Sequence, residues 1–392
     1  MQSAAPKHVE YVLRTLEAGG FQAHLVGGCV RDILLGRRPL DWDVCTNARP
    51  EAVLALFRKA LPTGLKHGTV TVKHGGGHVE VTTWRSESDY SDHRHPDEVR
   101  FIPDLEGDLL RRDFTMNAIA LDLRGNFTDP FGGREDLARG IIRCVGDADR
   151  RYDEDALRMF RALRFAARFG FAIEENSFAA IARNAALCRH LAPERVRDEL
   201  EKLICSAHPQ YAEDAFRLGL MEVFLPEKSA ELSLADLARL PKNPRGRWAG
   251  LCAILQREGL IPSADGFLSA LRLDNATIRA CTDGVNAALG APPTDALGWK
   301  RLISDRGTES ALCCAAACRM LHGGDPGREL RAVLRSGDCL FLKDLAVSGA
   351  DLMALGYRGR EVGEILHRLL SAVLENNELN TREALLALAK RP

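Results

Sequence analysis

Apolar and polar residues follow two different periods in the first third of this chain. Apolar positions spaced along one helical face predict helices, several of them ended by glycine or begun by proline: Pro6–Glu17, Val30–Leu35 and Pro50–Leu61. Alternation with a period of two predicts strands at His24–Val26, Asp41–Cys45, Thr69–Lys73, His78–Trp84, Asn117–Leu123 and Phe127–Asp129. Three glycines join the third and fourth of these strands as a hairpin. The pattern predicts a small mixed sheet with helices.

The pattern changes after about Asp147. Tyr152–Phe169 has helical periodicity, and the remainder of the chain shows almost only helical segments, separated by Gly, Pro and Asn breaks. The predicted fold class is therefore α+β, with an α/β head and an all-helical remainder. From the breaks we expect a head at 1–147, a helical neck at 148–205, a body at 206–335 and a tail at 336–392.

Composition narrows the function classes. The 53 Lys and Arg against 54 Asp and Glu leave a net charge of −1, so a polyanionic partner would need a local basic surface. The 11 cysteines include no CxxC pair, which predicts buried thiols in a reducing compartment instead of disulfides or a zinc site. The amino-terminal segment lacks the apolar core of a signal peptide, and no apolar stretch is long enough to cross a bilayer. We expect a cytoplasmic protein without membrane contact.

Two aspartates are the first candidate catalytic residues. Side chains alternate across a strand, so Asp41 and Asp43 would share one face while Trp42 points to the other. Two neighbouring carboxylates can hold Mg²⁺, and a pair of ions can clamp the attacking and leaving oxygens of a phosphoryl group. An acidic pair on a solvated strand is common, however, so this motif indicates a metal site only together with others.

A glycine turn stands directly upstream of the acidic pair. Gly27 and Gly28 follow a strand and begin a helix, which lets the backbone approach phosphate oxygens. Arg31, one turn into that helix, can pair with a triphosphate. An ordinary tight turn explains two glycines equally well. An ordinary tight turn does not explain why a strand, this turn, a helix and an acidic pair follow one another within about twenty residues.

Further charged residues extend the candidate site. Glu80 interrupts a strand-like run, so it faces either solvent or a site, where it would be a third carboxylate. Arg111 and Arg112 precede Asp113-Phe114 and an apolar run, and indicate contact with phosphate or nucleotide, although paired arginines are often plain surface charge.

The segment EDALRMFRALRF predicts a helix with a polar stripe, because Asp155, Arg158, Arg161 and Arg164 recur every third residue. Such a stripe is usually a solvated, salt-bridged face. A carboxylate beside a guanidinium would also match the amine and ring nitrogen that cytosine and adenine share, and would reject uracil and guanine. Arg161 and Arg164 would then hold phosphate or order the Asp155–Arg158 pair.

Taken together, these segments resemble the bacterial-type (class II) CCA-adding enzymes, the tRNA nucleotidyltransferases with a polymerase-β-like head. The resemblance is carried by LVGGCVRDILLGRRPLDWDVCTNA, HGTVTV, HVEVTTWRSE, RRDFTMNAIALD, DPFGG and EDALRMFRALRFAARFGF, in that order. It covers about the first 170 residues densely, and the segment SGADLMALGYRGREVGEILHRLLSAVLENNELNTRE is similar to the closing helices of the family.

The resemblance implies a role for each matching residue. Asp41 and Asp43 would bind two Mg²⁺ ions, and Gly28, Arg31 and Arg112 would contact the nucleotide. Asp155 and Arg158 would select CTP and then ATP, with Arg161 and Arg164 completing the pocket. The 3′-hydroxyl of the RNA would attack the α-phosphate in line and release pyrophosphate. The helical parts would hold the acceptor end of tRNA. The helices carry a group of basic residues that suits such a partner: Arg164, Arg168, Arg183, Arg189, Arg195 and Arg197.

Three alternative interpretations stay open. A bacterial poly(A) polymerase shares the glycine turn and the acidic pair, although the compact hairpin here favours the tRNA enzymes. The second is an enzyme that adds only CC or only A. The segment 88–96 resembles the loop that the family uses to switch from C to A; its presence argues against a CC-only enzyme but leaves an A-only enzyme open. A non-catalytic RNA-binding protein is the third, and the intact acidic residues argue against it.

Overall fold

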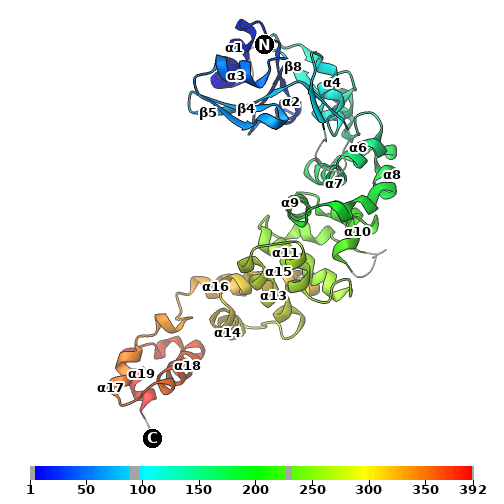
Figure 1. The fold of residues 1–392 in the computed structure, drawn as a ribbon. Helices are drawn as coiled ribbons and strands as arrows, with labels where there is room; N and C mark the ends of the chain where they lie inside the picture. Colours follow the sequence, from blue (N-terminus) through cyan, green and yellow to red (C-terminus); the bar gives the residue numbers. More distant parts are fainter. Residues whose placement is uncertain (1–4, 89–97, 226–231, 391–392) are drawn as a thin grey trace. The chain divides into compact units, whose positions relative to one another are not determined.

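A seven-stranded mixed sheet forms the amino-terminal part of the molecule (Figure 1). Its strand order is β3-β4-β5-β2-β1-β8-β9; β2 pairs with β5 in parallel and every other pair is antiparallel. The strands span Ala23–Val26 (β1), Asp43–Thr46 (β2), Ala60–Gly64 (β3), Thr69–His74 (β4), Gly77–Thr83 (β5), Ala120–Leu121 (β8) and Phe127–Thr128 (β9). The predicted strands and the predicted hairpin are therefore present, with shifted ends.

One predicted helix is too long. The apolar pattern over Pro50–Leu61 predicted a single helix, but helix α3 ends at Leu56 and the chain then forms β3. Phe57 already has an extended backbone, and the Lys73 amide donates to the Lys59 carbonyl as the chain enters the sheet. Hydrogen bonds to β4 at the sheet edge outweigh the local helical preference, which is a weak determinant for so short a segment.

Helices and two small sheets cover this main sheet. The first helices span Lys7–Ala18 (α1), Gly28–Leu34 (α2), Pro50–Leu56 (α3), Leu105–Leu110 (α4) and Gly133–Arg139 (α5). Two-stranded sheets form from Arg85–Ser88 (β6) with Glu98–Phe101 (β7), and from Ile141–Ile142 (β10) with Ala172–Ile173 (β11). A fully buried cluster that includes Val26, Cys45, Trp84, Leu109 and Val145 ties β1, β2 and the residue that follows β5 to α4.

The chain from residue 148 onward is almost entirely helical, as predicted. Its next helices span Ala148–Glu154 (α6), Leu157–Phe169 (α7), Glu175–Asn184 (α8), Pro193–Ile204 (α9) and Ala212–Arg217 (α10). The structure describes residues 5–88, 98–225 and 232–390, and contacts divide the chain into two units, Met1–Val223 and Phe224–Pro392. The sheet and α1–α10 thus belong to one unit.

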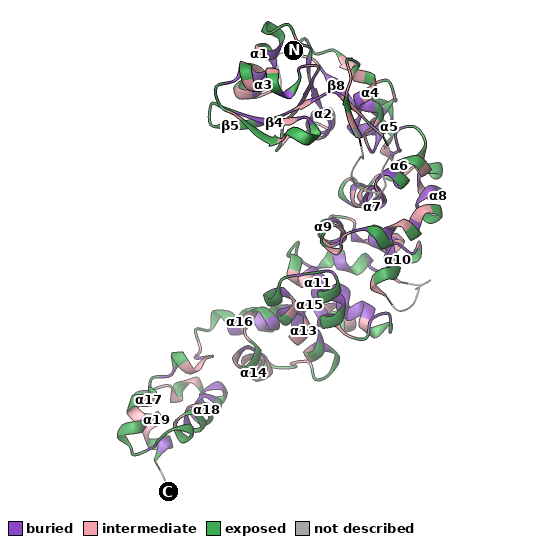
Figure 2. Cartoon of the chain, viewed as in Figure 1, coloured by how far each residue is buried: buried purple, intermediate pink, exposed green. Residues whose placement is uncertain are grey.

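The second unit contains only helices among its described residues: Pro244–Arg257 (α11), Ala264–Ala270 (α12), Asn275–Leu289 (α13), Ala296–Arg306 (α14), Thr308–His322 (α15), Gly327–Arg335 (α16), Gly349–Ala354 (α17), Arg360–Glu375 (α18) and Arg382–Ala389 (α19). Most residues of α11 and α15 are buried (Figure 2), which is the pattern of helices at the centre of a helical core. The predicted fold class is confirmed, and the finer division into neck, body and tail stays a prediction.

The structure also bears on the expectations for the cysteines and for membrane-spanning segments. All 11 cysteines are free thiols, and all except Cys205 are buried. Burial raises the pKa of the Cys29 and Cys144 thiols to about 11, so these side chains behave as small apolar groups. Within the described ranges, no helix has the length and apolar composition that crossing a bilayer requires.

Candidate active site

The turn between β1 and α2 brings the backbone close to side chains from two distant elements. Gly27 has a φ of 76°, in a region that only glycine adopts without strain. A Cβ at this position would lie 3.2 Å from Arg112 Nη1 and 3.8 Å from Asp43 Oδ2. The predicted glycine turn therefore meets one member of the acidic pair, Asp43, and one member of the arginine pair, Arg112.

The acidic pair lies where β2 begins. The prediction placed Asp41 inside this strand, but the strand starts at Asp43, and Asp41 lies in the bend before it. The predicted alternation holds nevertheless: Trp42 is 8% exposed, whereas Asp41 is exposed and Asp43 is half-buried.

Glu80 stands beside Asp43 on the neighbouring strand. The two residues are paired in the parallel register of β2 and β5, so their side chains project from the same face of the sheet. Glu80 itself is exposed. Burial raises the pKa of Asp43, and the negative charges of Glu80 and Asp41 raise it further against the opposing effect of Arg112.

These carboxylates are suited to bind a divalent cation whose other ligands come from a bound phosphate. A bound cation would offset the electrostatic repulsion among the neighbouring carboxylates of Asp41, Asp43 and Glu80. Among the residues with described positions, no three His, Cys, Asp or Glu side chains form a group able to hold a metal on their own. Mg²⁺ commonly takes one or two carboxylates and completes its ligands with substrate phosphates and water. The donor set of Asp41 and Asp43 fits that mode.

Both arginines of the Arg111–Arg112 pair are fixed by one buried carboxylate. Arg111 Nη2 lies 2.8 Å from Asp108 Oδ1, and Arg112 Nη2 lies 3.1 Å from Asp108 Oδ2. Burial alone would raise the pKa of Asp108, but the two guanidinium groups bring it below its ordinary value. Arg112 Nε is buried with no hydrogen-bond partner in the described structure. Asp108 thus orients Arg112 toward Gly27 and Asp43.

Arg31 is more deeply enclosed than its predicted role suggested. Its side chain is 5% exposed, donates to Asp32 Oδ1 at 2.8 Å and to Asn117 Oδ1 at 2.8 Å, and lies against the rings of Phe165 and Phe169. Its Nη2 would be 3.6 Å from a Cβ on Gly28. Arg31 therefore supports the glycine turn from beneath and links it to α7.

The predicted single helix over Tyr152–Phe169 is in fact two helices. Asp155 has φ −146° and ψ 102°, an extended conformation that ends α6, and α7 begins at Leu157. Asp155 Oδ1 accepts from the Leu157 amide at 3.1 Å, the local bond through which aspartate favours helix starts over helix interiors. The expectation that Asp155 lies on the helix was therefore wrong, although it lies directly beside it.

Each polar residue of the predicted stripe has a specific partner of opposite charge. Asp155 pairs with Arg195 at 2.9 Å, and Arg158 donates to Glu154 at 2.7 Å. Arg161 Nε donates to Asp113 Oδ2 at 2.9 Å, and Arg164 pairs with Glu199. The apolar residues between them are buried, as predicted: Leu157, Phe160, Leu163 and Phe165. The stripe is thus a set of oriented ionic groups on a packed helix.

Comparisons with known proteins match almost the whole chain to described families. The family model described as the poly A polymerase head domain matches residues 23–143, and that of the RNA- and SrmB-binding site of polymerase A matches residues 170–232. A tRNA nucleotidyltransferase domain 2 model matches residues 245–389. The CCA-adding enzyme of Geobacillus kaustophilus is 40% identical over 388 residues, which cover 96% of this chain and 94% of that protein.

This chain belongs to the family of CCA-adding enzymes. The CCA-adding enzyme of Lactiplantibacillus plantarum is 36% identical over 97% of this chain and 94% of that protein. Among solved structures, the CCA-adding enzyme of Bacillus stearothermophilus in complex with CTP superposes with a TM-score of 0.83 at 36% identity, covering 99% of this chain and 97% of that chain. The polymerase-β-like fold predicted for the head follows from this membership.

Sequence reasoning missed the residues that hold the others in place. Asp108, Asp113 and Glu199 are buried carboxylates, each bound to an arginine of the predicted site. Arg195 and Glu199 lie four residues apart on α9, a spacing that puts both on one helical face. That spacing was visible in the sequence, but nothing in it showed that this face packs on α7. The predicted switch segment 88–96 lies almost wholly outside the described residues.

The Asp113–Arg161 ion pair gives a testable stability prediction. Burial would by itself raise the pKa of Asp113, but Arg161, helped by Asn117, brings it well below the usual range of an aspartate. We expect Asp113→Asn to lower the free energy of unfolding by about 3 kcal/mol at pH 7, because it leaves a guanidinium without its buried counter-charge. Urea unfolding of both proteins measures this difference.

The pH dependence of that difference has a defined sign. The folded pKa of Asp113 lies below its unfolded value, so its contribution is complete above about pH 4 and declines as the pH falls further. The matched control is Asp149→Asn, whose pair with Arg183 is about half exposed and should contribute far less. Equal effects of the two substitutions would contradict the prediction.

Proposed function

We propose that this chain adds C, C and A to the 3′ end of tRNA, using CTP and ATP and releasing pyrophosphate, at a site formed by Asp41, Asp43, Gly27, Gly28 and Arg112. The observation that carries this assignment is the convergence of the glycine turn, Asp43 and a partly unsatisfied arginine, Arg112, where the interior strand β1 ends and β2 begins. The full-length match to CCA-adding enzymes favours CCA addition over polyadenylation.

Members of this family depend on divalent metal ions, and we assign Asp41 and Asp43 as the protein ligands of two Mg²⁺ ions. When bound, such ions would activate the RNA 3′-hydroxyl and stabilise the departing pyrophosphate. The protein's own part is to hold one carboxylate at the start of β2 and a second in the bend before it, with the raised pKa of Asp43 reflecting burial and the neighbouring acids. Trp42, packed on the opposite side, fixes the direction of both.

The nucleotide's phosphates would lie along the glycine turn. Gly27 and Gly28 expose backbone without side chains, so oxygen atoms can approach closely. Arg112 presents donors from behind, held by Asp108, and Arg111 is held by the same carboxylate. Arg31 reinforces the turn, with its own charge balanced by Asp32.

The base would be read by Asp155 and Arg158. A carboxylate has about four lone-pair sites, so Asp155 can bind Arg195 and still accept from an exocyclic amine of cytosine or adenine. Arg158 is fixed by Glu154 and by the Arg111 carbonyl, which links base recognition to the phosphate side of the site. Arg161 and Arg164 complete this pocket on the next turns of α7.

The helical parts would bind tRNA, with the neck at 148–205, the body at 206–335 and the tail at 336–392. Five of the six predicted basic residues lie within 4.0 Å of a carboxylate: Arg164, Arg168, Arg183, Arg195 and Arg197. Their charge is thus partly neutralised, and RNA phosphates would have to share or displace these partners. We infer a cytoplasmic location, where tRNA is processed.

Three tRNA transcripts test the proposed activity directly. Transcripts ending before CCA, after C and after CC are incubated with one labelled nucleotide at a time. We expect CTP to extend the first two, and ATP to extend only the third, by a single residue. Extension by ATP alone of the third transcript, with none by CTP, would identify an A-adding enzyme. Long adenosine tracts on any transcript would identify a poly(A) polymerase.

The role of Glu80 is a separate prediction. We expect Glu80→Gln to lower kcat roughly tenfold to a hundredfold, because it removes one of the charges that attract cations to Asp43. The Mg²⁺ concentration for half-maximal activity should rise in parallel. His78→Gln is the matched control, since His78 is exposed on the same face of β5 two residues earlier. Identical kinetics for the two variants would assign Glu80 to the solvated surface.

A further inference from the structure

The second unit contains an apolar hollow, lined by none of the residues assigned above to nucleotidyl transfer. It has a volume of about 260 Å³ and lies between α11, α15 and α16. Its apolar wall includes Leu240, Pro241, Leu312, Ala315, Ala316 and Leu330. An apolar cavity of about 150 Å³ holds a benzene-sized ligand, so this one has room for roughly ten non-hydrogen atoms.

Small residues create the space. Ala315 and Ala316 on α15 have side chains too small to fill the hollow, and Gly246 faces them from α11. Beneath it, the core is tight, because a Cβ on Gly250 would lie 2.7 Å from Leu240 Cδ1. The hollow is therefore bounded by rigid helices, as small-molecule sites usually are.

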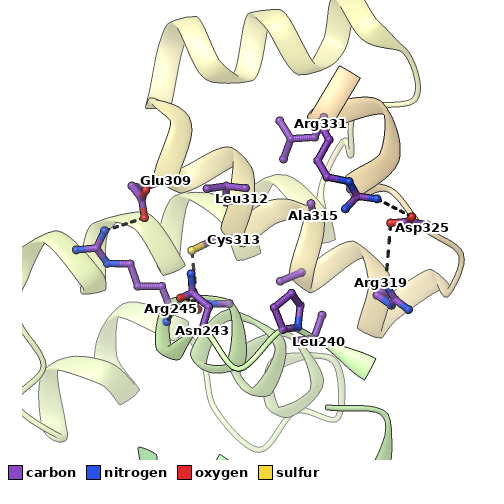
Figure 3. Close-up of a pocket in the computed structure, with 15 residues that line it drawn as sticks. Leu240, Asn243, Arg245, Glu309, Leu312, Cys313, Ala315, Arg319, Asp325 and Arg331 are labelled. Carbon is purple, nitrogen blue, oxygen red and sulfur yellow. Dashed lines mark hydrogen bonds and ion pairs between the residues drawn. The ribbon is translucent and has the colours of Figure 1, made fainter. Parts of the chain in front are cut away.

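Charge is distributed unevenly around the mouth (Figure 3). On one side Arg245 donates to Glu309 at 2.8 Å and to Thr277, so its charge is balanced. On the other side Arg319 and Arg331 share the single carboxylate of Asp325. Arg331 takes the close contact, at 2.8 Å, and Arg319 Nη1 remains 4.0 Å away. This side carries one excess positive charge.

The geometry points to a binding site for a small amphipathic carboxylate, with its chain in the hollow and its carboxylate beside Arg319. The wall would bury a hydrocarbon body, which is the dominant favourable contribution for such a ligand. A carboxylate at the mouth would give Arg319 a closer partner than Asp325 provides, and hydrogen bonds between ionised groups are the stronger kind. A nucleotide phosphate lacks the apolar body that this wall requires.

Octanoate, which is about the size of the hollow, is the probe. Titration calorimetry with the full chain should give a dissociation constant of about 1 mM or lower. 1-Octanol should bind about tenfold more weakly because it lacks the charge, and acetate should not bind measurably. Equal binding of octanoate and octanol, or no binding of either, would overturn the proposal.

Variants locate the site and separate its two parts. Ala315→Leu fills the hollow and should weaken octanoate at least tenfold, while Arg319→Gln should weaken octanoate and leave octanol unchanged. Arg328→Gln is the matched control, because Arg328 is exposed on α16 and does not line the hollow. Leu312→Ala, at a side chain 40% exposed, perturbs the wall with little risk to folding. Unchanged octanoate affinity in both Ala315→Leu and Leu312→Ala would place binding elsewhere and reject the site.

Discussion

A chain carrying Asp41→Asn together with Asp43→Asn should incorporate CMP and AMP at least about a thousandfold more slowly than the unchanged protein. The substitution keeps the size of both side chains and removes the charge that would attract the metal ions. Because the two residues sit at the start of β2 with Trp42 packed behind them, the backbone has little reason to change. Single-turnover incorporation into a tRNA transcript ending before CCA measures the loss.

RNA retention distinguishes lost chemistry from lost binding. The doubly substituted protein should hold tRNA as tightly as the parent, since its helical parts are untouched. Asp236→Asn removes a negative charge at an exposed position of the second unit, so it is the control for losing a carboxylate outside the proposed active site. Incorporation within tenfold of the parent would remove the metal-ligand role of this pair. Retention of tRNA by both proteins, with no incorporation by the parent itself, would leave the third alternative, a protein that only binds RNA, as the better account.

Asp155→Ala should have the second-largest effect, on selectivity. We expect the ratio of kcat/KM for CTP over UTP to fall by about a hundredfold, because the proposed acceptor for the cytosine amine would be gone. The metal dependence should stay the same, since Asp155 belongs to the junction of α6 and α7 and not to β2. Competition between labelled CTP and excess UTP or GTP measures the ratio.

Two variants sharpen this test. Asp153→Ala removes an exposed carboxylate two residues earlier and should leave selectivity unchanged. Arg195→Gln removes the recorded partner of Asp155 without touching Asp155 itself, so it should reduce selectivity less than Asp155→Ala does. If all three proteins discriminate equally, the base is read elsewhere. Arg158→Ala is less informative, because its guanidinium also bridges Glu154 and two backbone carbonyls and its loss would disturb the fold.

The sequence by itself determined the local features of this protein. The alternation around Trp42 predicted which side the two aspartates would occupy, and the glycine at Gly27 predicted the turn, because both depend on neighbours only a few residues away. The helical remainder was equally predictable from its period. Local propensity failed at the end of Pro50–Leu61, where the chain leaves α3 and enters an edge strand. It also failed at Asp155, where an extended backbone ends α6 and the side chain accepts from the Leu157 amide at the start of α7.

Only the tertiary structure decided which groups meet. Gly27, Asp43 and Arg112 are far apart along the chain, and their contact follows from the order of strands in the sheet. The carboxylate partners of Arg161 and Arg164 come from the turn at Asp113 and from α9, and no spacing in the sequence connects these segments with α7. Ion pairs form between groups a few ångström apart in space, whereas the periodicity of a sequence reports only distance along the backbone. Ion-pair partners from distant segments can therefore be identified only once the packing is known.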